Sequence, residues 1–185
     1  MATGLGAANS VAAEVLSATA DWLPLPTMRE VARRAPNEVL AIAAADPLFY
    51  SWVGFTLSLA KDSVTPPDTR EILAETTHTE YLETELRGAE LVKGIALAIG
   101  VRPRVAMFAS PEDGYELIAR LGLMLAEGAT VRMRFDEDEL PDVTLKTGPD
   151  GEEQTWTAFA AGYWALLNTF LEVDPDAPGS ATDGD

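Results

Sequence analysis

The longest regular pattern in the chain is helical, and it constrains the fold more than any other feature. It begins at Asp68, directly after Pro66 and Pro67, and predicts one helix that extends to Gly100. Residues at helical spacing form one stripe along this segment, which we expect to face the core. The stripe consists of Ala74, His78, Leu82, Leu86, Ala89, Val92, Ala96 and Ile99.

The residues before this segment also have helical spacing. A helix is predicted near residues 7–21, and the two prolines within residues 23–26 are expected to end it. Thr27 and Asn37 are suitable N-cap residues for two further helices. Between Pro47 and Ala60 almost no polar face remains. A helix that is apolar all round lies in the centre of a core or in an interface.

The second half of the chain mixes strand and helix patterns. Strands are predicted at residues 104–109, 130–135, 143–147 and 152–156. A helix follows Ser110, with a buried stripe of Leu117, Ile118, Leu121, Met124 and Leu125, and a last helix carries Phe159, Tyr163, Leu167 and Phe170. The predicted order is β-α-β-β-β-α around a small mixed sheet.

These patterns predict one α+β domain over residues 1–173. Its helical part spans about residues 7–100, and its sheet-containing part spans about residues 101–173. Residues 174–185 form an acidic tail rich in glycine and proline, which we expect to be flexible.

The charge balance limits the partners that the chain can bind. Asp and Glu number 30 against 13 Lys and Arg, for a net charge of −17. Direct binding to nucleic acid needs clustered basic residues, so it is not expected. The few lysines and many alanines are typical of a GC-rich genome or a salt-adapted cytoplasm, where acidity keeps proteins soluble. Alternatively, the acidic surface, including residues 136–139, imitates nucleic acid and binds a basic or DNA-binding partner.

One apolar stretch has a length that suits a membrane span. Residues 39–60 contain a single charge, Asp46, followed by Pro47 near the centre of the stretch. An aspartate at that depth costs roughly 3 kcal/mol, and the proline interrupts the helix. We therefore expect two buried helices rather than a span. The N-terminus does not resemble a secretory signal, so a cytoplasmic location, or one within an assembled particle, is expected.

A possible metal site lies in the long helical segment. Glu75 and His78 form the E-x-x-H pair that places a carboxylate and an imidazole on one face of a helix in di-iron and di-manganese bundles. A metal-dependent enzyme of this kind would hold iron or manganese. His78 is the single histidine, so a second metal would need carboxylates alone or a second subunit. The alternative is a histidine at the edge of the core, satisfied by a neighbouring Glu or Thr.

Four arginines are candidates for an anion site. Arg132 and Arg134 share one face of the predicted strand 130–135, while Arg102 and Arg104 precede the strand 104–109. Parallel pairing of these strands would gather all four, in a cluster suited to a carboxylate or phosphate. The alternative is that they pair with acidic residues on adjoining strands, namely Asp142, Glu152 or Glu153.

The remaining inventory favours binding over catalysis. The chain has no cysteine, and it contains neither a nucleophile motif nor a glycine-rich phosphate loop. Aromatic residues of the kind enriched in protein interfaces are abundant instead. The candidates are Phe49, Trp52, Phe55 and Trp164. The leading interpretation is a non-enzymatic protein that binds other protein subunits, either copies of itself or a heterologous partner, in an assembly such as a virion or secretion apparatus.

Overall fold

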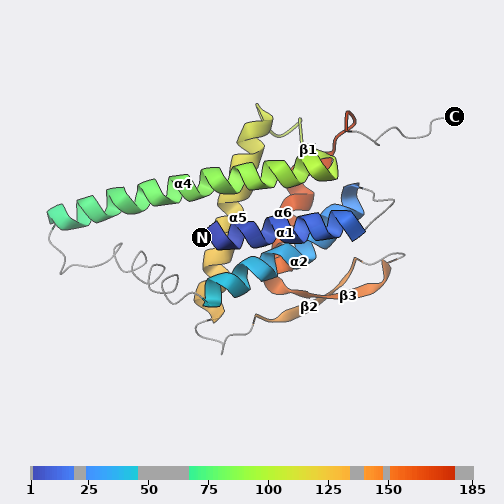
Figure 1. Ribbon diagram of the computed structural model, residues 1–185, viewed down its shortest axis with the longest axis horizontal. Coiled ribbons are helices and arrows are strands. Elements are labelled where there is room, and N and C mark those ends of the chain that lie inside the picture. Colours follow the sequence, from blue (N-terminus) through green and yellow to red (C-terminus); the bar gives the residue numbers. More distant parts are fainter. Residues whose placement is uncertain (1, 19–23, 46–66, 134–139, 148–150, 178–185) are drawn as a thin grey trace.

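A computed structural model describes residues 2–18, 24–45, 67–133, 140–147 and 151–177 (Figure 1). The helices are α1 (Ala2–Ala18), α2 (Pro24–Ala45), α4 (Pro67–Ile99), α5 (Pro111–Met133) and α6 (Ala158–Phe170). The strands are β1 (Val101–Pro103), β2 (Asp142–Lys146), β3 (Glu153–Thr157) and β4 (Leu171–Val173). The predicted α+β class is confirmed.

The helices cross one another around a shared core. In Figure 1, α1 and α2 lie side by side, α5 and α6 lie behind them, and α4 runs across the top. The closest helix pairs are α1 with α2, α4 with α5, α2 with α6 and α5 with α6. The bulkiest buried side chains come from several of these elements and from strands: Trp156, Met28, Ile99, Ile118 and Val101.

The predicted helix from Asp68 to Gly100 is confirmed as α4, which ends just before Gly100, a residue with a φ of 80°. Its stripe is buried only in the second half of the helix, at Ala89, Ala96 and Ile99. The residues expected to be buried in the first half, from Ala74 to Leu86, are exposed. Figure 1 shows the reason, because the first turns of α4 project beyond the other described helices.

Side-chain caps fix the starts of α5 and α6. The Asp113 carboxylate accepts a hydrogen bond from the Ser110 backbone N–H at 3.1 Å, and the Ser110 hydroxyl accepts one from the Asp113 N–H at 3.2 Å. This reciprocal pair confirms the helix start predicted at Ser110. Thr157 accepts from the Ala160 N–H at 3.1 Å and donates to the Asn37 side chain at 2.6 Å. The α6 cap is therefore also attached to α2.

Asn37 was expected to begin a new helix, and this prediction was wrong. One helix, α2, runs through both Thr27 and Asn37 and includes Pro36. The Asn37 side chain donates to the Arg33 carbonyl oxygen at 3.1 Å, inside the same helix. An added hydrogen bond of this kind helps to offset the backbone donor that a proline removes.

The strands form two antiparallel pairs rather than one mixed sheet. β1 pairs with β4, with Arg102 opposite Glu172, and β2 pairs with β3, with Val143 opposite Trp156. The two strands of the second pair lie where the sequence predicted them. β4 was not predicted, and the strand expected at 104–109 is replaced by β1 at 101–103 followed by a turn.

The prediction of a strand at 130–135 was also wrong for the described residues 130–133, because α5 continues to Met133. Thr130 is buried, and its hydroxyl donates to the Ala126 carbonyl oxygen at 2.8 Å, as β-branched hydroxyl residues do inside helices. Alternation over so short a segment is compatible with either structure, and packing of α5 decided the outcome.

Candidate functional site

The residues of the predicted metal pair lie on the projecting part of α4. Glu75 and His78 are both exposed. Across the part of the chain that the structure describes, no group of three or more His, Asp or Glu side chains is arranged to hold a metal ion. The described residues therefore provide no further ligands for this pair.

The predicted arginine cluster does not form among the described residues. Arg102 lies on β1, which pairs with β4 in the antiparallel direction, so the expected parallel pairing was wrong. Arg132 lies near the far end of α5, about 30 Å along the helix from its start at the rise of an α-helix. Arg134 falls outside the described residues.

Groups of the protein itself bind both Arg102 and Arg104. Arg102 forms ion pairs with Glu172 at 3.5 Å, Asp174 at 3.3 Å and Asp176 at 3.8 Å. These partners are not the predicted ones, which were Asp142, Glu152 or Glu153. Two of them belong to the predicted tail, whose first residues contact β1 through this arginine. Arg104 donates to the carbonyl oxygens of Thr169 at 2.8 Å and Asn168 at 3.1 Å. It thereby satisfies the C-terminal end of α6.

Of the four aromatic interface candidates, the structure describes Trp164. This residue is half-buried on α6, and its ring centroid lies 6.5 Å from that of Trp156. It packs against the core of the domain. Phe49, Trp52 and Phe55 lie outside the described residues, as do residues 136–139 of the acidic segment. None of the helices described is long and apolar enough to cross a membrane.

An apolar groove opens between α5 and α6, with a volume of about 480 Å³. No charged side chain is present among the described residues that line it: Leu121, Met124, Leu125, Gly162, Ala165, Leu166, Thr169 and Phe170. Met124 is 60% exposed and Leu125 is 37% exposed, although the sequence predicted both as buried. Hydrophobic side chains of this size are therefore accessible along the groove.

The groove extends toward the turn that follows β1. The Phe108 ring lies 5.8 Å from the Phe170 ring, and the Arg104 N–H donates to the Phe170 carbonyl oxygen at 2.9 Å. Val105 and Met107, in the same turn, are both more than half exposed. The exposed apolar surface therefore continues past the end of α6.

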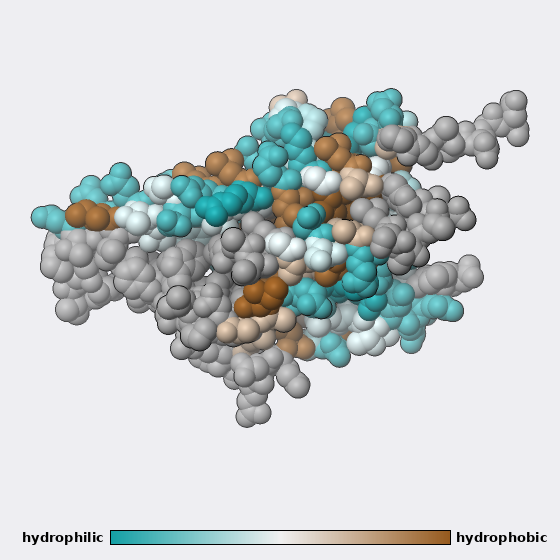
Figure 2. Space-filling view, in the orientation of Figure 1, coloured by the Kyte–Doolittle hydropathy of each residue, from teal (hydrophilic) through white to brown (hydrophobic). Residues whose placement is uncertain are grey.

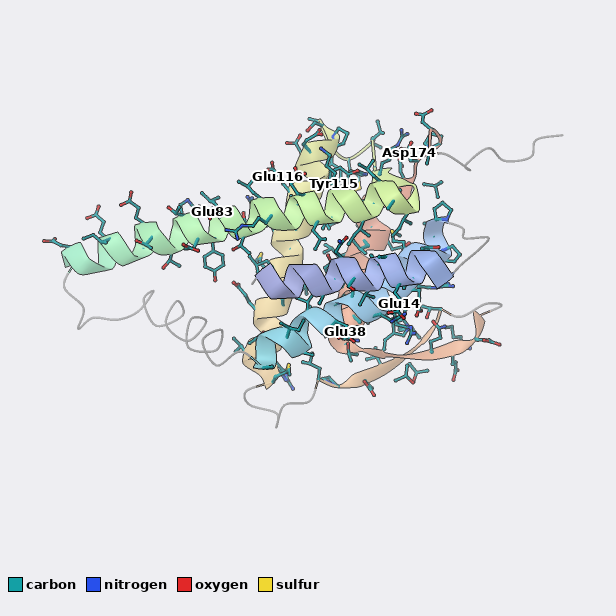
Figure 3. All side chains as sticks on the ribbon, in the orientation of Figure 1. Glu14, Glu38, Glu83, Tyr115, Glu116 and Asp174 are labelled. Carbon is teal, nitrogen blue, oxygen red and sulfur yellow. The ribbon has the colours of Figure 1, made fainter. Side chains whose placement is uncertain are left out.

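Acidic residues are concentrated at the start of α5, where Glu112 pairs with Lys93 of α4 at 3.4 Å. Glu112, Asp113 and Glu116 are exposed in the first turns of α5. Figure 3 shows Glu116 near Tyr115 and the region of Asp174. Burial, followed by the nearby carboxylates of Asp174 and Glu112, raises the pKa of Tyr115. The start of α5 is thus acidic, and its Glu112 faces α4 rather than the groove between α5 and α6.

A second hollow lies between the helices of the core and is partly open to solvent. This cavity has a volume of about 170 Å³ and is lined by α1, α2, α4, α5, α6, β1 and β4. Figure 2 shows hydrophobic residues at the surface between α4 and α1, two of the helices that line it. Protein cores rarely contain voids much larger than a water molecule.

Two described lining residues carry polar side chains, and they differ in their hydrogen bonds. Thr84 donates its hydroxyl to the Glu80 carbonyl oxygen at 2.9 Å. Burial raises the pKa of Tyr163 to about 12. The Tyr163 ring packs tightly over Gly122, where a Cβ atom would lie 2.9 Å from the ring carbon Cε2.

Glu127 is a partly buried acid between α5 and α4. Burial is the main cause that raises its pKa. A hydrogen bond from Tyr81 lowers it, and the Glu85 carboxylate raises it further. Glu85 in turn pairs with Arg120 at 3.0 Å. The charged form of Glu127 is therefore less favourable in the folded state than in the unfolded chain.

This shift predicts that Glu127→Gln stabilises the protein in a pH-dependent way. The folded pKa lies above the ordinary value of 4.5, so both states are protonated below that pH and the variant should match the wild type there. As pH rises through the folded pKa, the wild type acquires the unfavourable charge, and the variant becomes the more stable protein. Urea unfolding at several pH values measures the difference. A variant that is less stable at pH 7 contradicts the prediction.

No protein-family model, curated protein or solved structure matches this chain. The argument for function therefore depends on the groove, the cavity and the charges around them. Sequence reasoning missed both hollows. One signal for the groove is visible in the sequence, because α6 contains no charged residue although the chain is strongly acidic.

Proposed function

We propose that this protein is a non-enzymatic binding component whose α5–α6 groove receives an amphipathic helix with basic flanks from a partner protein. The observation that supports this proposal most directly is the groove itself, which is apolar and uncharged in a chain with 30 acidic and 13 basic residues. Exposed apolar surface of this kind marks sites of protein interaction. Helices bind such grooves by inserting side chains spaced at i, i+3, i+4 and i+7.

Charge supports a basic partner over a second copy of the chain. Each copy carries a net charge of −17, so two copies repel one another as they approach. The excess of acidic residues on the chain would attract basic residues that flank the apolar side of a bound helix. This arrangement accelerates association and selects against acidic partners. It also gives the acidity of the chain a role in recognition.

Two helical peptides of about 18 residues test this proposal. They share one leucine face and differ in carrying lysine or glutamate on the other face. Fluorescence anisotropy should show that the leucine/lysine peptide binds the wild type and that the leucine/glutamate peptide does not. Binding should weaken as the salt concentration rises from about 0.05 M to about 0.5 M, because salt screens the charges.

Variants of the groove separate docking from general attraction to an acidic surface. The double change Met124→Gln and Leu125→Gln should weaken binding of the leucine/lysine peptide by about tenfold or more. Leu97→Gln is the matched control, since Leu97 is 58% exposed on α4 and does not line the groove. Equal loss in both variants, or none in either, overturns the proposal. Light scattering tests a second copy as the occupant. A wild-type dimer that dissociates in the groove variant would also overturn the proposal, because a second copy would then fill the groove.

A further inference from the structure

We infer that the cavity in the helical core binds a small, uncharged molecule of about the size of a single aromatic ring, with one oxygen that hydrogen-bonds to the Tyr163 hydroxyl. This inference is independent of the groove, which lies between the outer faces of α5 and α6 and has a different set of lining residues. The inference assigns a ligand to the cavity.

The size of the cavity sets the size of the ligand. Its volume is about 170 Å³. An apolar protein cavity of about 150 Å³ stays free of water and accepts benzene or xenon. Small residues contribute to the lining, among them Ala8, Ala119 and Ala126. Where such positions carry large side chains instead, they fill the core.

The lining sets the chemical class of the ligand. No charged side chain lines the cavity among the described residues, so a carboxylate or ammonium group would lose its hydration without a counter-charge. Most lining residues are aliphatic or aromatic, including Met28, Ile95 and Phe159. The ligand is therefore mainly apolar and has no net charge.

Tyr163 supplies the polar contact. Its side chain lines the cavity, and no hydrogen bond joins its hydroxyl to another residue in the part of the chain that the structure describes. Thr84, the other hydroxyl at the lining, already donates within its own helix. A hydroxyl or carbonyl oxygen on the ligand would accept a hydrogen bond from the Tyr163 hydroxyl, which makes none within the described part of the chain.

Fluorine NMR with three probes tests this inference on the full chain. The probes are 4-fluorophenol, fluorobenzene and the charged 4-fluorobenzoate. We expect saturable binding of the first two, with 4-fluorophenol tighter by about threefold to tenfold, the usual net effect of one hydrogen bond. We expect no binding of 4-fluorobenzoate. Absence of saturable binding by both neutral probes overturns the inference, and so does equal binding of the benzoate.

Four variants locate the binding site. Tyr163→Phe should remove the preference for 4-fluorophenol and leave fluorobenzene unchanged. Ala126→Leu should fill the cavity and abolish binding of both probes, while the matched control Ala98→Leu, on an exposed position of α4, should not. Met124→Gln in the groove should have no effect. The inference is overturned if Met124→Gln loses binding, or if Tyr163→Phe keeps the preference for 4-fluorophenol. The Tyr163→Phe test remains decisive even if Ala126→Leu fails to fold.

Discussion

Replacing Trp156 by alanine is expected to lower the free energy of unfolding by about 3–5 kcal/mol. Trp156 on β3 is 1% exposed and is the largest fully buried side chain among the described residues. Its indole N–H donates to the Thr147 hydroxyl at 2.9 Å, and that hydroxyl donates to the Gln154 side chain at 2.9 Å. The substitution therefore removes a large apolar contact and also breaks a buried hydrogen-bond chain.

Urea denaturation measures this loss, and two variants separate its causes. Trp156→Phe keeps much of the volume but removes the N–H donor, so about 1–2 kcal/mol is expected. Trp164→Ala removes the neighbouring ring, which is half-buried, and should also cost less than Trp156→Ala. A loss below about 1 kcal/mol for Trp156→Ala would show that β2 and β3 contribute little to the stability of the helical core.

Local signals in the sequence predicted a large part of this fold. The capping pair of Ser110 and Asp113 determines where α5 begins, and Gly100 marks where α4 ends. Both depend on residues within a few positions of one another. The two strands predicted at 143–147 and 152–156 are likewise neighbours in the sequence, and they pair with each other as β2 and β3. Features decided over short sequence distances are the ones that a sequence expresses directly.

Long-range pairing could not be predicted in this way. β4 is three residues long and pairs with β1 from the other end of the C-terminal half. Nothing in its sequence distinguishes it from the end of α6. Because β4 is the strand beside β1, Arg102 meets Glu172 and Asp174 instead of the other predicted arginines. The predicted anion cluster failed for this topological reason.

Hydrophobic periodicity in the sequence could not predict the groove or the cavity. The apolar stripe of α5 correctly placed Ile118 in the core, but Met124 and Leu125 in the same stripe remain exposed. An apolar stripe indicates which face of a helix is apolar. The length and position of the neighbouring helices decide how much of that face is covered. The cavity depends even more on packing, because a void exists where side chains from separate elements fail to meet. The sequence places Tyr163 among the apolar and aromatic residues of the last helix, but it does not show that Tyr163 lines a cavity.

Replacing Gly114 and Gly128 by alanine is expected to change stability in opposite directions, although both residues lie in α5. At Gly114 a Cβ atom would lie 2.8 Å from Cγ of Pro103 and 3.1 Å from Cδ2 of Phe108. The proline ring is rigid and β1 is paired with β4, so the strand or the helix must shift. Crowding of this kind typically costs about 1–3 kcal/mol, and it should exceed the gain of up to about 1 kcal/mol in helix propensity.

Gly128 is the matched control for this prediction. It is exposed, and a Cβ atom there would meet nothing within 4 Å. Gly128→Ala should therefore raise the free energy of unfolding by about 0.5–1 kcal/mol, because alanine is the better helix former. Urea midpoints for the two variants give the comparison. If both moved in the same direction, the close approach of α5 to β1 at Gly114 would be wrong. The contact that holds the start of α5 against β1 would then be wrong too.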